Sequence, residues 1–485
     1  MFFFSHIVVY DSGSGITTAT TLLQHSDIVP IVKAMQNTDT KENIMGTEKI
    51  SSLIVKISLP LMVSMLVQAL YNIVDSIFVA MLSETALTAV SLAFPLQNLL
   101  IAFGVGTGVG MASFMSRKLG SGDIETAEHV AGNGLTLAFI TWIVFAILGL
   151  TAARPFLSLY TEDEELLNLS NEYAVIVMVF SLFMFLTLMN ERILQGTGDS
   201  FSSMLSQLSG AVTNIILDPV FIFTFRMGVA GAAIATVIGQ VVSFVVSTYL
   251  VTKNRYIRIR RHHLKPKKQF VTSIYSVGAP TIVTNSISTV MTGALNGILI
   301  AFSTTAVSVF SVYFKLQSFV FMPIFGLSSG MIPIIAYNYG AGKRMRMLET
   351  TKKGTVISFT IMVAGTIVFQ LLPHTLLSLF SATGEMYRIG EPALRIISIC
   401  FTPAAVSIGL SSSFQATGFG LGTMITAVLR QLFVLIPAAY IFSRLGGLLG
   451  VWWAFPFAEV FGLMVSIGLY VYVYRTRIKP TPDNA

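Results

Sequence analysis

Polar side chains recur at helical spacing inside three hydrophobic stretches in the first half of the chain. They are Gln68, Asn72 and Asp75 in one stretch, Asn214 and Asp218 in another, and Thr236 and Gln240 in a third. Because members of a set lie four or seven residues apart, each set faces one side of its helix. Carboxylate, amide and hydroxyl oxygens are the ligands of hard cations such as Na⁺, and two crowded carboxylates also carry a proton, since like charges keep one of them protonated. The pattern therefore predicts a site for Na⁺ or H⁺ and leaves the choice between them open.

The two aspartates are expected at one depth in the membrane. At 1.5 Å per residue, Asp75, Asp218 and Thr236 each lie about 10 Å from the outer end of their own helix. A carboxylate there costs on the order of 3 kcal/mol on insertion scales, so two at one level indicate a shared task. Asp75, Asn214, Asp218 and Thr236 are the predicted cation-coupling residues, and the other polar residues of the three sets support them. The alternative is that both acids only hydrogen-bond neighbouring helices.

The composition is that of a protein that crosses a membrane many times. Hydrophobic residues make up 54% of the 485 residues and charged residues 11%, against a usual charged share of about 25%. Twelve apolar stretches are each long enough to cross about 30 Å of hydrocarbon as a helix. We therefore expect an all-α polytopic membrane protein. The net charge of +7 is concentrated in a few loops, which indicates orientation toward a cytoplasmic surface and not nucleic-acid binding.

The sequence repeats itself at a spacing of 220 residues. Pro60 recurs as Pro280, and the Gln-x-Thr-Gly motif at 195–198 recurs at 415–418. Each copy holds six spans, and an even number gives both copies the same orientation. The prediction is two parallel-repeat six-helix bundles with pseudo-two-fold symmetry about the membrane normal, a plan that permits alternating access by rocking one half against the other.

The repeat divides the chain into two bundles and three cytoplasmic segments. The expected bounds are 1–50 for an N-terminal segment, 51–252 for the first bundle, 253–269 for a basic linker, 270–475 for the second bundle and 476–485 for a tail. Lys and Arg crowd the loops of one side, which places that side and both termini in the cytoplasm. His262 and His263 in the linker suggest a metal site, but beside so many cations a solvated loop is the preferred interpretation.

The first residues contain no membrane-spanning run and no convincing secretory signal peptide. A polar stretch opens at Met35 and leads into the first hydrophobic helix. We expect translation to start at Met35 or Met45, with 1–34 lying upstream of the true start.

The second half lacks the acids of the first. Leu295 and Ala438 stand where the first half has its two aspartates, so binding of the coupling ion is expected in the first half. Glu459 and Arg430 are the deep charges of the second half that we interpret as a structural ion pair, with a second titrating site as the alternative. Pro219 follows Asp218 in the first half, and proline removes a helix hydrogen bond. This predicts a bend that either moves with the acid or is static.

Other signals argue against nucleotide chemistry and catalysis. The Gly-x-Gly-x-Gly-x-Gly run at 104–110 has no preceding strand and no Walker lysine, so it indicates close helix approach and no nucleotide site. No nucleophile or metal set with catalytic spacing is present in the sequence, and we expect neither an enzyme nor a cofactor. Energy for transport must then come from an ion gradient.

Several segments resemble the MATE (multidrug and toxic compound extrusion) family. The resemblance runs from about Gly46 to Arg475 and rests on SLPLMVSMLVQALYNIVDSIFVA, RKLGSGDIETAEHVAGNG, QGTGDS, NIILDP and GVAGAAIATVIGQ. It implies twelve helices in two bundles around a central cavity, and export of drug-like, often cationic compounds in exchange for Na⁺ or H⁺. It places the chain closest to bacterial multidrug exporters with acids in the first half, and so in a bacterial plasma (inner) membrane. A monomer is expected.

The family's cation-site residues match this sequence position by position. The span-one aspartate corresponds to Asp75, the Asn-x-x-x-Asp of span five to Asn214 and Asp218, and the span-six threonine to Thr236. Substrate contacts are harder to read from the sequence. The candidates for the substrate cavity are Tyr71, Tyr313 and Gln317.

Two other functions compete with a cation-coupled drug antiporter. A lipid-linked sugar flippase of the same superfamily handles large anionic head groups and needs cavity arginines or lysines, which the first half does not offer at depth. A channel or a receptor needs polar residues along the whole path, whereas the first-half stripes stop at one level.

Overall fold

The computed structural model describes residues 43–380, 382 and 384–483, and every named element in this part is a helix or a helical turn. The first half holds α2 (Ile44–Thr47), α3 (Ile50–Ala80), α4 (Glu84–Gly120), α5 (Ile124–Thr151), α6 (Ala153–Leu157), α7 (Glu164–Val179), α8 (Leu182–Gly196), α9 (Ser200–Pro219), the π-helical turn η2 (Val220–Thr224) and α10 (Gly228–Thr252). The segment 1–34 and the expected start at Met35 lie outside the described residues, whereas Met45 lies in α2.

The second half follows the same order after a linker. It holds the 3₁₀ turn η3 (Arg261–Leu264), α11 (Lys268–Ile300), α12 (Thr304–Gly340), α13 (Arg344–Leu371), α14 (Pro373–Ser378), α15 (Gly384–Ser398), α16 (Phe401–Ala416), α17 (Gly420–Val428), the π turn η4 (Leu429–Leu435), α18 (Ile436–Val473) and the π turn η5 (Tyr474–Ile478).

The described helices supply twelve membrane spans. Nine apolar stretches are long enough to span, and two bent pairs, α7 with α8 and α15 with α16, add one span each. The last stretch, Gly420–Ile478, has 59 residues, which is far longer than the ~20 residues that cross one bilayer. Gly447 interrupts it with a φ of 61°, a left-handed conformation that glycine adopts without strain. The chain therefore bends there and crosses the membrane twice.

The 220-residue repeat is visible in the start points and caps of the helices. The starts of α4, α5, α7 and α9 recur 220 residues later in α12, α13, α15 and α17. Ser83 and Ser303 cap α4 and α12 in the same way, because each hydroxyl accepts a hydrogen bond from the backbone N–H three residues on. Equivalent local chemistry therefore produces equivalent helices in the two halves.

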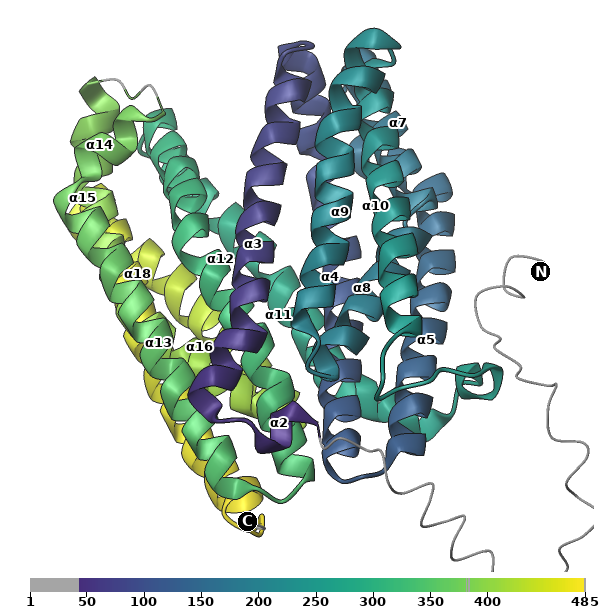
Figure 1. The fold of residues 1–485 in the computed structure, drawn as a ribbon. Coiled ribbons are helices and arrows are strands. Elements are labelled where there is room, and N and C mark those ends of the chain that lie inside the picture. Colours follow the sequence, from purple (N-terminus) through teal and green to yellow (C-terminus); the bar gives the residue numbers. More distant parts are fainter. Residues whose placement is uncertain (1–42, 381, 383, 484–485) are drawn as a thin grey trace, which may run out of the picture.

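The two bundles converge at one end and diverge at the other, as the ribbon in Figure 1 shows. At the convergent end, α4 packs along α11 and α3 packs along α12. Glycines permit this approach: a Cβ on Gly120 would overlap the carbonyl of Tyr337, and one on Gly340 would overlap the carbonyl of Arg117. Toward the opposite end of α11, by contrast, a Cβ on Gly293 would meet nothing within 4 Å.

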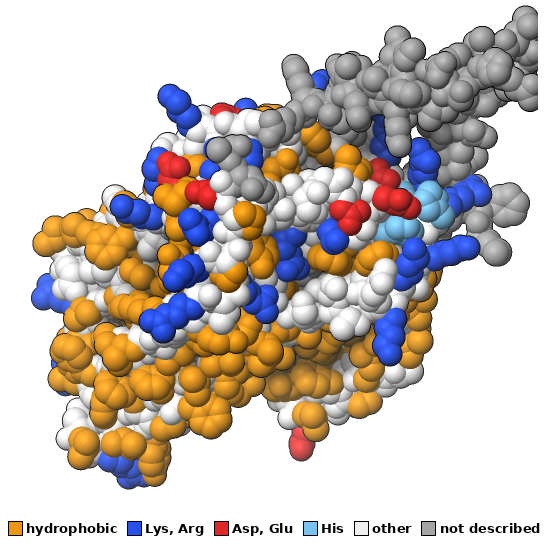
Figure 2. Space-filling view, turned by 90° about the horizontal axis from the view of Figure 1, so that it is seen from below, with side chains coloured by type: hydrophobic (Ala, Val, Ile, Leu, Met, Phe, Trp, Pro, Cys, Tyr) orange, Lys and Arg blue, Asp and Glu red, His pale blue; other side chains and the backbone are white. Residues whose placement is uncertain are grey.

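Basic side chains gather on the face at the convergent end, which Figure 2 presents to the viewer. Short α2 and the end of the chain lie at the same end of the molecule (Figure 1). Asn43 donates to the carbonyl of Thr197 in the first half at 3.0 Å, and Asn338 of the second half donates to the carbonyl of Met45 at 2.9 Å. Segment 43–48 thus bridges the two halves where they meet.

The glycine contacts at the convergent end predict a mutational effect on the arrangement of the bundles. Gly340→Ala should force the two bundles apart, because the added methyl group overlaps backbone that cannot rotate away. Double electron–electron resonance between spin labels at Ser121→Cys and Lys352→Cys, both exposed positions, should report a longer distance in the variant.

The matched control is Gly293→Ala, which adds a methyl group to open space and should leave the distance unchanged. Cys400 is the only native cysteine and is replaced by serine in every labelled protein. An unaltered distance in Gly340→Ala would contradict the view that these glycines set the closure.

Candidate cation-binding site

The candidate site lies inside the first bundle, where three helices meet. α9 packs along α10 on one side and along α3 on the other (Figure 1). Asn214 and Asp218 lie one helical turn apart on α9 and are 2% and 0% exposed, and Thr236 on α10 is buried opposite them. The Asn214 amide donates to Asp218 Oδ1 and to Thr236 Oγ1, both at 3.3 Å. One amide group therefore connects the acid to the neighbouring helix.

Asp75 completes the site from α3. Its carboxyl group lies within hydrogen-bonding reach of the carboxyl group of Asp218, as the equal depths of the two residues predicted. An ionised carboxylate only accepts hydrogen bonds, so two such groups in contact repel each other. A proton or a metal cation between them removes that repulsion.

Three buried oxygens of the site accept no hydrogen bond in the part of the chain that the structure describes, namely Oδ1 of Asp75, Oδ1 of Asn214 and Oδ2 of Asp218. Oε1 of Gln240, one helical turn from Thr236 on α10, is unpaired as well. Buried polar atoms are almost always paired in proteins, so a group of unpaired acceptors at one place calls for a specific explanation. A set made only of oxygens suits a hard cation, and the same set suits a proton shared by the carboxyl groups.

Two tyrosines extend the site. The Tyr71 hydroxyl lies within hydrogen-bonding reach of Thr236, although the sequence led us to expect Tyr71 in the substrate cavity. Tyr173 of α7 lies close to Asp75 and is 2% exposed, and its hydroxyl accepts a hydrogen bond from the Gln97 amide at 3.0 Å. Sequence reasoning did not find Tyr173 or Gln97. Tyr71 lies four positions before Asp75, and this helical spacing is the sequence signal that could have placed it beside the acid.

Gln68 and Asn72 lie outside the group of unpaired oxygens. The Gln68 amide donates to Asn72 Oδ1 at 3.3 Å, and the Gln207 amide of α9 donates to Gln68 Oε1 at 3.4 Å. Asn72 is exposed. These residues therefore link α3 to α9, and their supporting role at the site stays a prediction.

The helix that carries Asp218 changes its geometry directly after the acid. α9 ends at Pro219 and continues as the π turn η2. Proline has no N–H to close the preceding turn, and π turns in helices often occur at functional sites. The second half has a π turn of its own, η4, but it directly follows the short helix α17 and so corresponds to the middle of α9 and not to η2. The bend predicted from Pro219 is therefore a local widening of the helix.

Two deep charges of the second bundle neutralise each other. Arg430 Nη1 lies 2.8 Å and 2.7 Å from the two carboxylate oxygens of Glu459, which is the ion pair that the sequence suggested. Tyr313 is 1% exposed and packs against Phe310 in the hydrophobic core of this bundle. In this conformation Tyr313 therefore faces no open space, which differs from its expected place in the cavity. Gln317 is half-buried on the same helix.

Comparison with protein families gives a match to the family described as MatE, at residues 60–220 and 280–441. The two matched segments repeat the internal spacing of the chain. The chain is 28% identical over 432 residues to the "Multidrug export protein MepA" of Staphylococcus haemolyticus, covering 88% of this chain and 94% of that protein. It is 27% identical over 425 residues to the protein of the same name from Staphylococcus aureus strain MSSA476, covering 87% and 93%.

Solved structures with the same architecture include the "outward-facing conformation of a multidrug resistance MATE family transporter of the MOP superfamily", with a TM-score of 0.85, 28% identity, and coverage of 91% of this chain and 98% of that chain. A MOP superfamily transporter from Pyrococcus furiosus, described as having a binding pocket of reverse polarity that suggests a different function, matches with a TM-score of 0.85, 27% identity and the same coverage.

The ion pair of the second bundle predicts a difference between buried and exposed pairs. Glu459→Gln should lower the free energy of unfolding by about 3 kcal/mol, because it leaves the largely buried Arg430 side chain without its counter-charge. Glu164→Gln breaks the exposed pair between Arg154 and Glu164 and should change the free energy of unfolding by less than about 1 kcal/mol. Denaturant unfolding of the detergent-solubilised protein measures both, and equal effects would contradict a structural role for the buried pair.

Proposed function

The chain belongs to the MatE family, and from this premise we propose that it is a multidrug efflux transporter that exports drug-like, mostly cationic compounds in exchange for Na⁺ or H⁺. The observation that carries the coupling is the contact between the Asp75 and Asp218 carboxyl groups, surrounded by unpaired buried oxygens. Such a site holds a proton or a small cation and loses it when the surrounding helices move apart. The names of the MepA relatives support drugs as the cargo.

α3 connects the candidate cation site to the interface between the two bundles. Asp75 lies in one part of this helix, and its other part packs on α12 of the second bundle, where a Cβ on Gly326 would contact Met62 backbone at 2.6 Å. Ser58 of α3 donates to the carbonyl of Leu327 at 3.4 Å. A shift of α3 on loading or release of the cation therefore changes contacts that the two bundles must break to open on the other side.

The charge distribution sets the direction of transport in this proposal. The convergent end carries the basic face, and basic loops remain on the cytoplasmic side of a membrane. With that orientation the termini are cytoplasmic, the protein lies in a plasma membrane, and the described conformation is closed toward the cytoplasm. A cation then enters the site from outside. The loaded protein changes to the form that opens toward the cytoplasm and binds the drug, as exchange by alternating access requires.

A lipid-linked sugar flippase remains the alternative within the superfamily. Its anionic head groups require free arginines or lysines deep in the pathway. Arg430 lies deep in the second bundle, but Glu459 already neutralises it. Lys315 is an exposed lysine within α12. The acid pair of the first bundle nevertheless favours a carrier of cations over a carrier of large anions.

The proposal predicts that Asp218→Asn abolishes coupled efflux. The amide keeps the shape of the side chain but neither binds a proton nor supplies a full negative charge to a cation. Ethidium transport is measured in inverted vesicles with Na⁺ and pH gradients imposed separately. Transport by Asp218→Asn should fall to background with either gradient. In the wild type, the gradient that drives ethidium transport identifies the coupling ion.

Glu162→Gln is the matched control, because this acid is exposed in the loop before α7 and its loss should leave transport intact. Insertion of each variant is checked by its amount in the membrane. Wild-type ethidium export by Asp218→Asn would remove the assignment of this residue.

A further inference from the structure

Three histidine rings meet where the linker between the bundles docks on α5. His129 lies in the second turn of α5, and His262 and His263 lie in η3. Ring centroids are 4.7 Å apart for His129 and His263, 3.9 Å for His262 and His263, and 5.7 Å for His129 and His262. His263 is 2% exposed, so this part of the linker is not the solvated loop that the sequence suggested.

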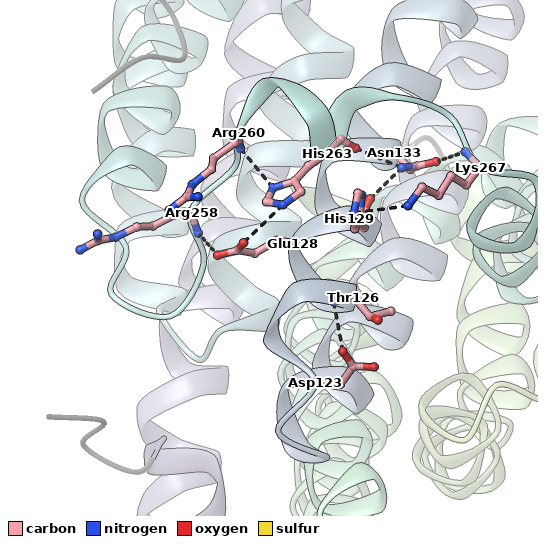
Figure 3. A network of polar contacts seen from close by, with 9 residues as sticks. All are labelled: Asp123, Thr126, Glu128, His129, Asn133, Arg258, Arg260, His263 and Lys267. Atoms are coloured by element: carbon pink, nitrogen blue, oxygen red, sulfur yellow. Dashed lines mark hydrogen bonds and ion pairs between the residues drawn. The ribbon is translucent and has the colours of Figure 1, made fainter. Parts of the chain in front are cut away.

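Hydrogen bonds from α5 hold the linker in this position (Figure 3). The Asn133 amide donates to the carbonyls of His263 and Lys265 at 3.1 Å and 3.2 Å, and its oxygen accepts from the Lys267 N–H at 2.9 Å. The Thr136 hydroxyl donates to the carbonyl of Leu264 at 2.6 Å. Residues about 130 positions apart in the sequence are therefore fixed against each other, which is the rigidity that a ligand site needs.

The ring nitrogens of the two buried histidines have different surroundings. His263 Nδ1 accepts the Arg260 N–H at 3.1 Å, and Nε2 lies 3.5 Å from the Glu128 carboxylate. His129 Nε2 lies 3.5 Å from the Lys267 ammonium. His129 Nδ1 is buried and has no hydrogen-bond partner among the described residues. An unpaired buried ring nitrogen costs free energy and calls for a partner that protein atoms do not supply.

The surroundings also lower the pKa of the buried His263 ring. Burial is the main cause, and the neighbouring His262, His129 and Arg260 add to it, so that this pKa falls to about 4. A neutral imidazole has a free lone pair on one nitrogen, and only the neutral ring ligates a metal.

We propose that His129, His262 and His263 bind one divalent transition-metal ion of the Zn²⁺ class on the basic face of the protein. One ligand nitrogen from each residue lies within 4.8 Å of the others. Tetrahedral coordination at about 2.0–2.1 Å requires nitrogens about 3.4 Å apart, so the rings must move closer together on binding, and the exposed His262 side chain has room to rotate. Three imidazoles with water in the fourth position are an established Zn²⁺ arrangement.

Glu128 supports the site from outside the ligand set. If His263 ligates through Nδ1, it gives up the Arg260 N–H, and its Nε2–H still points at the Glu128 carboxylate. A carboxylate that accepts from a ligating histidine fixes the orientation of the ring and strengthens it as a ligand. Lys267, Arg258 and Arg260 oppose the binding of a further cation, so we expect an affinity in the micromolar range, weaker than that of a structural zinc site.

Equilibrium binding of Zn²⁺ to the full-length protein in detergent tests the site. The protein is purified with a tag that contains no histidine, and binding is followed by isothermal titration calorimetry. The expected result is one Zn²⁺ per chain. His262→Ala should weaken binding at least 10-fold and, because His262 is exposed, should leave the melting temperature of the metal-free protein unchanged. Zn²⁺ should raise the melting temperature of the wild type and not that of His262→Ala.

His374→Ala is the matched control, because this exposed histidine pairs with Glu391 on helices away from the cluster. A His6→Ala/His25→Ala variant tests the two histidines of the N-terminal segment. Both variants should bind Zn²⁺ like the wild type. The site is overturned if the wild type binds no Zn²⁺, or if His262→Ala and His129→Ala bind it with unchanged affinity.

Discussion

The contact between two carboxyl groups inside the first bundle is the constraint on which the rest of the account depends. Asp75 lies on α3 and Asp218 on α9. Neither carboxyl group in its ionised form donates a hydrogen bond to the other. Their proximity is favourable only with a positive charge or a proton between them. Asn214 and Thr236 hold the buried acid from the other side, so the fold maintains the contact instead of relieving it.

The second bundle shows what the same architecture does without that constraint. Its deep acid, Glu459, is paired with Arg430 within the protein and needs no ion from solution. The positions equivalent to the two aspartates are Leu295 and Ala438, both buried in the core of this bundle. The chain thus combines one bundle that requires a mobile charge with one whose deep acid is already paired, and glycine-lined contacts join them at one end.

Helix periodicity made much of this site predictable. The spacing of Asn214 and Asp218, and the common depth of Asp75 and Thr236, follow from local geometry, and the structure places these four side chains together. Tyr173 and Gln97 are single polar residues on α7 and α4, and their meeting depends on tertiary packing that no local pattern records. The same holds for His129, which lies more than 130 residues from the linker histidines. Tyr313 was expected in a cavity, but aromatic neighbours from α12 and α18 bury it.

Ion release on drug binding is the most direct test of the central claim. Ethidium is added to purified protein in weakly buffered detergent solution, and released H⁺ and Na⁺ are measured with a pH-sensitive dye and a sodium-selective electrode. The account predicts release of one of the two ions by the wild type and none by Asp75→Asn. Ethidium binding without release of either ion, or equal release by Asp75→Asn, would contradict the claim that the carboxyl pair holds the exchanged cation.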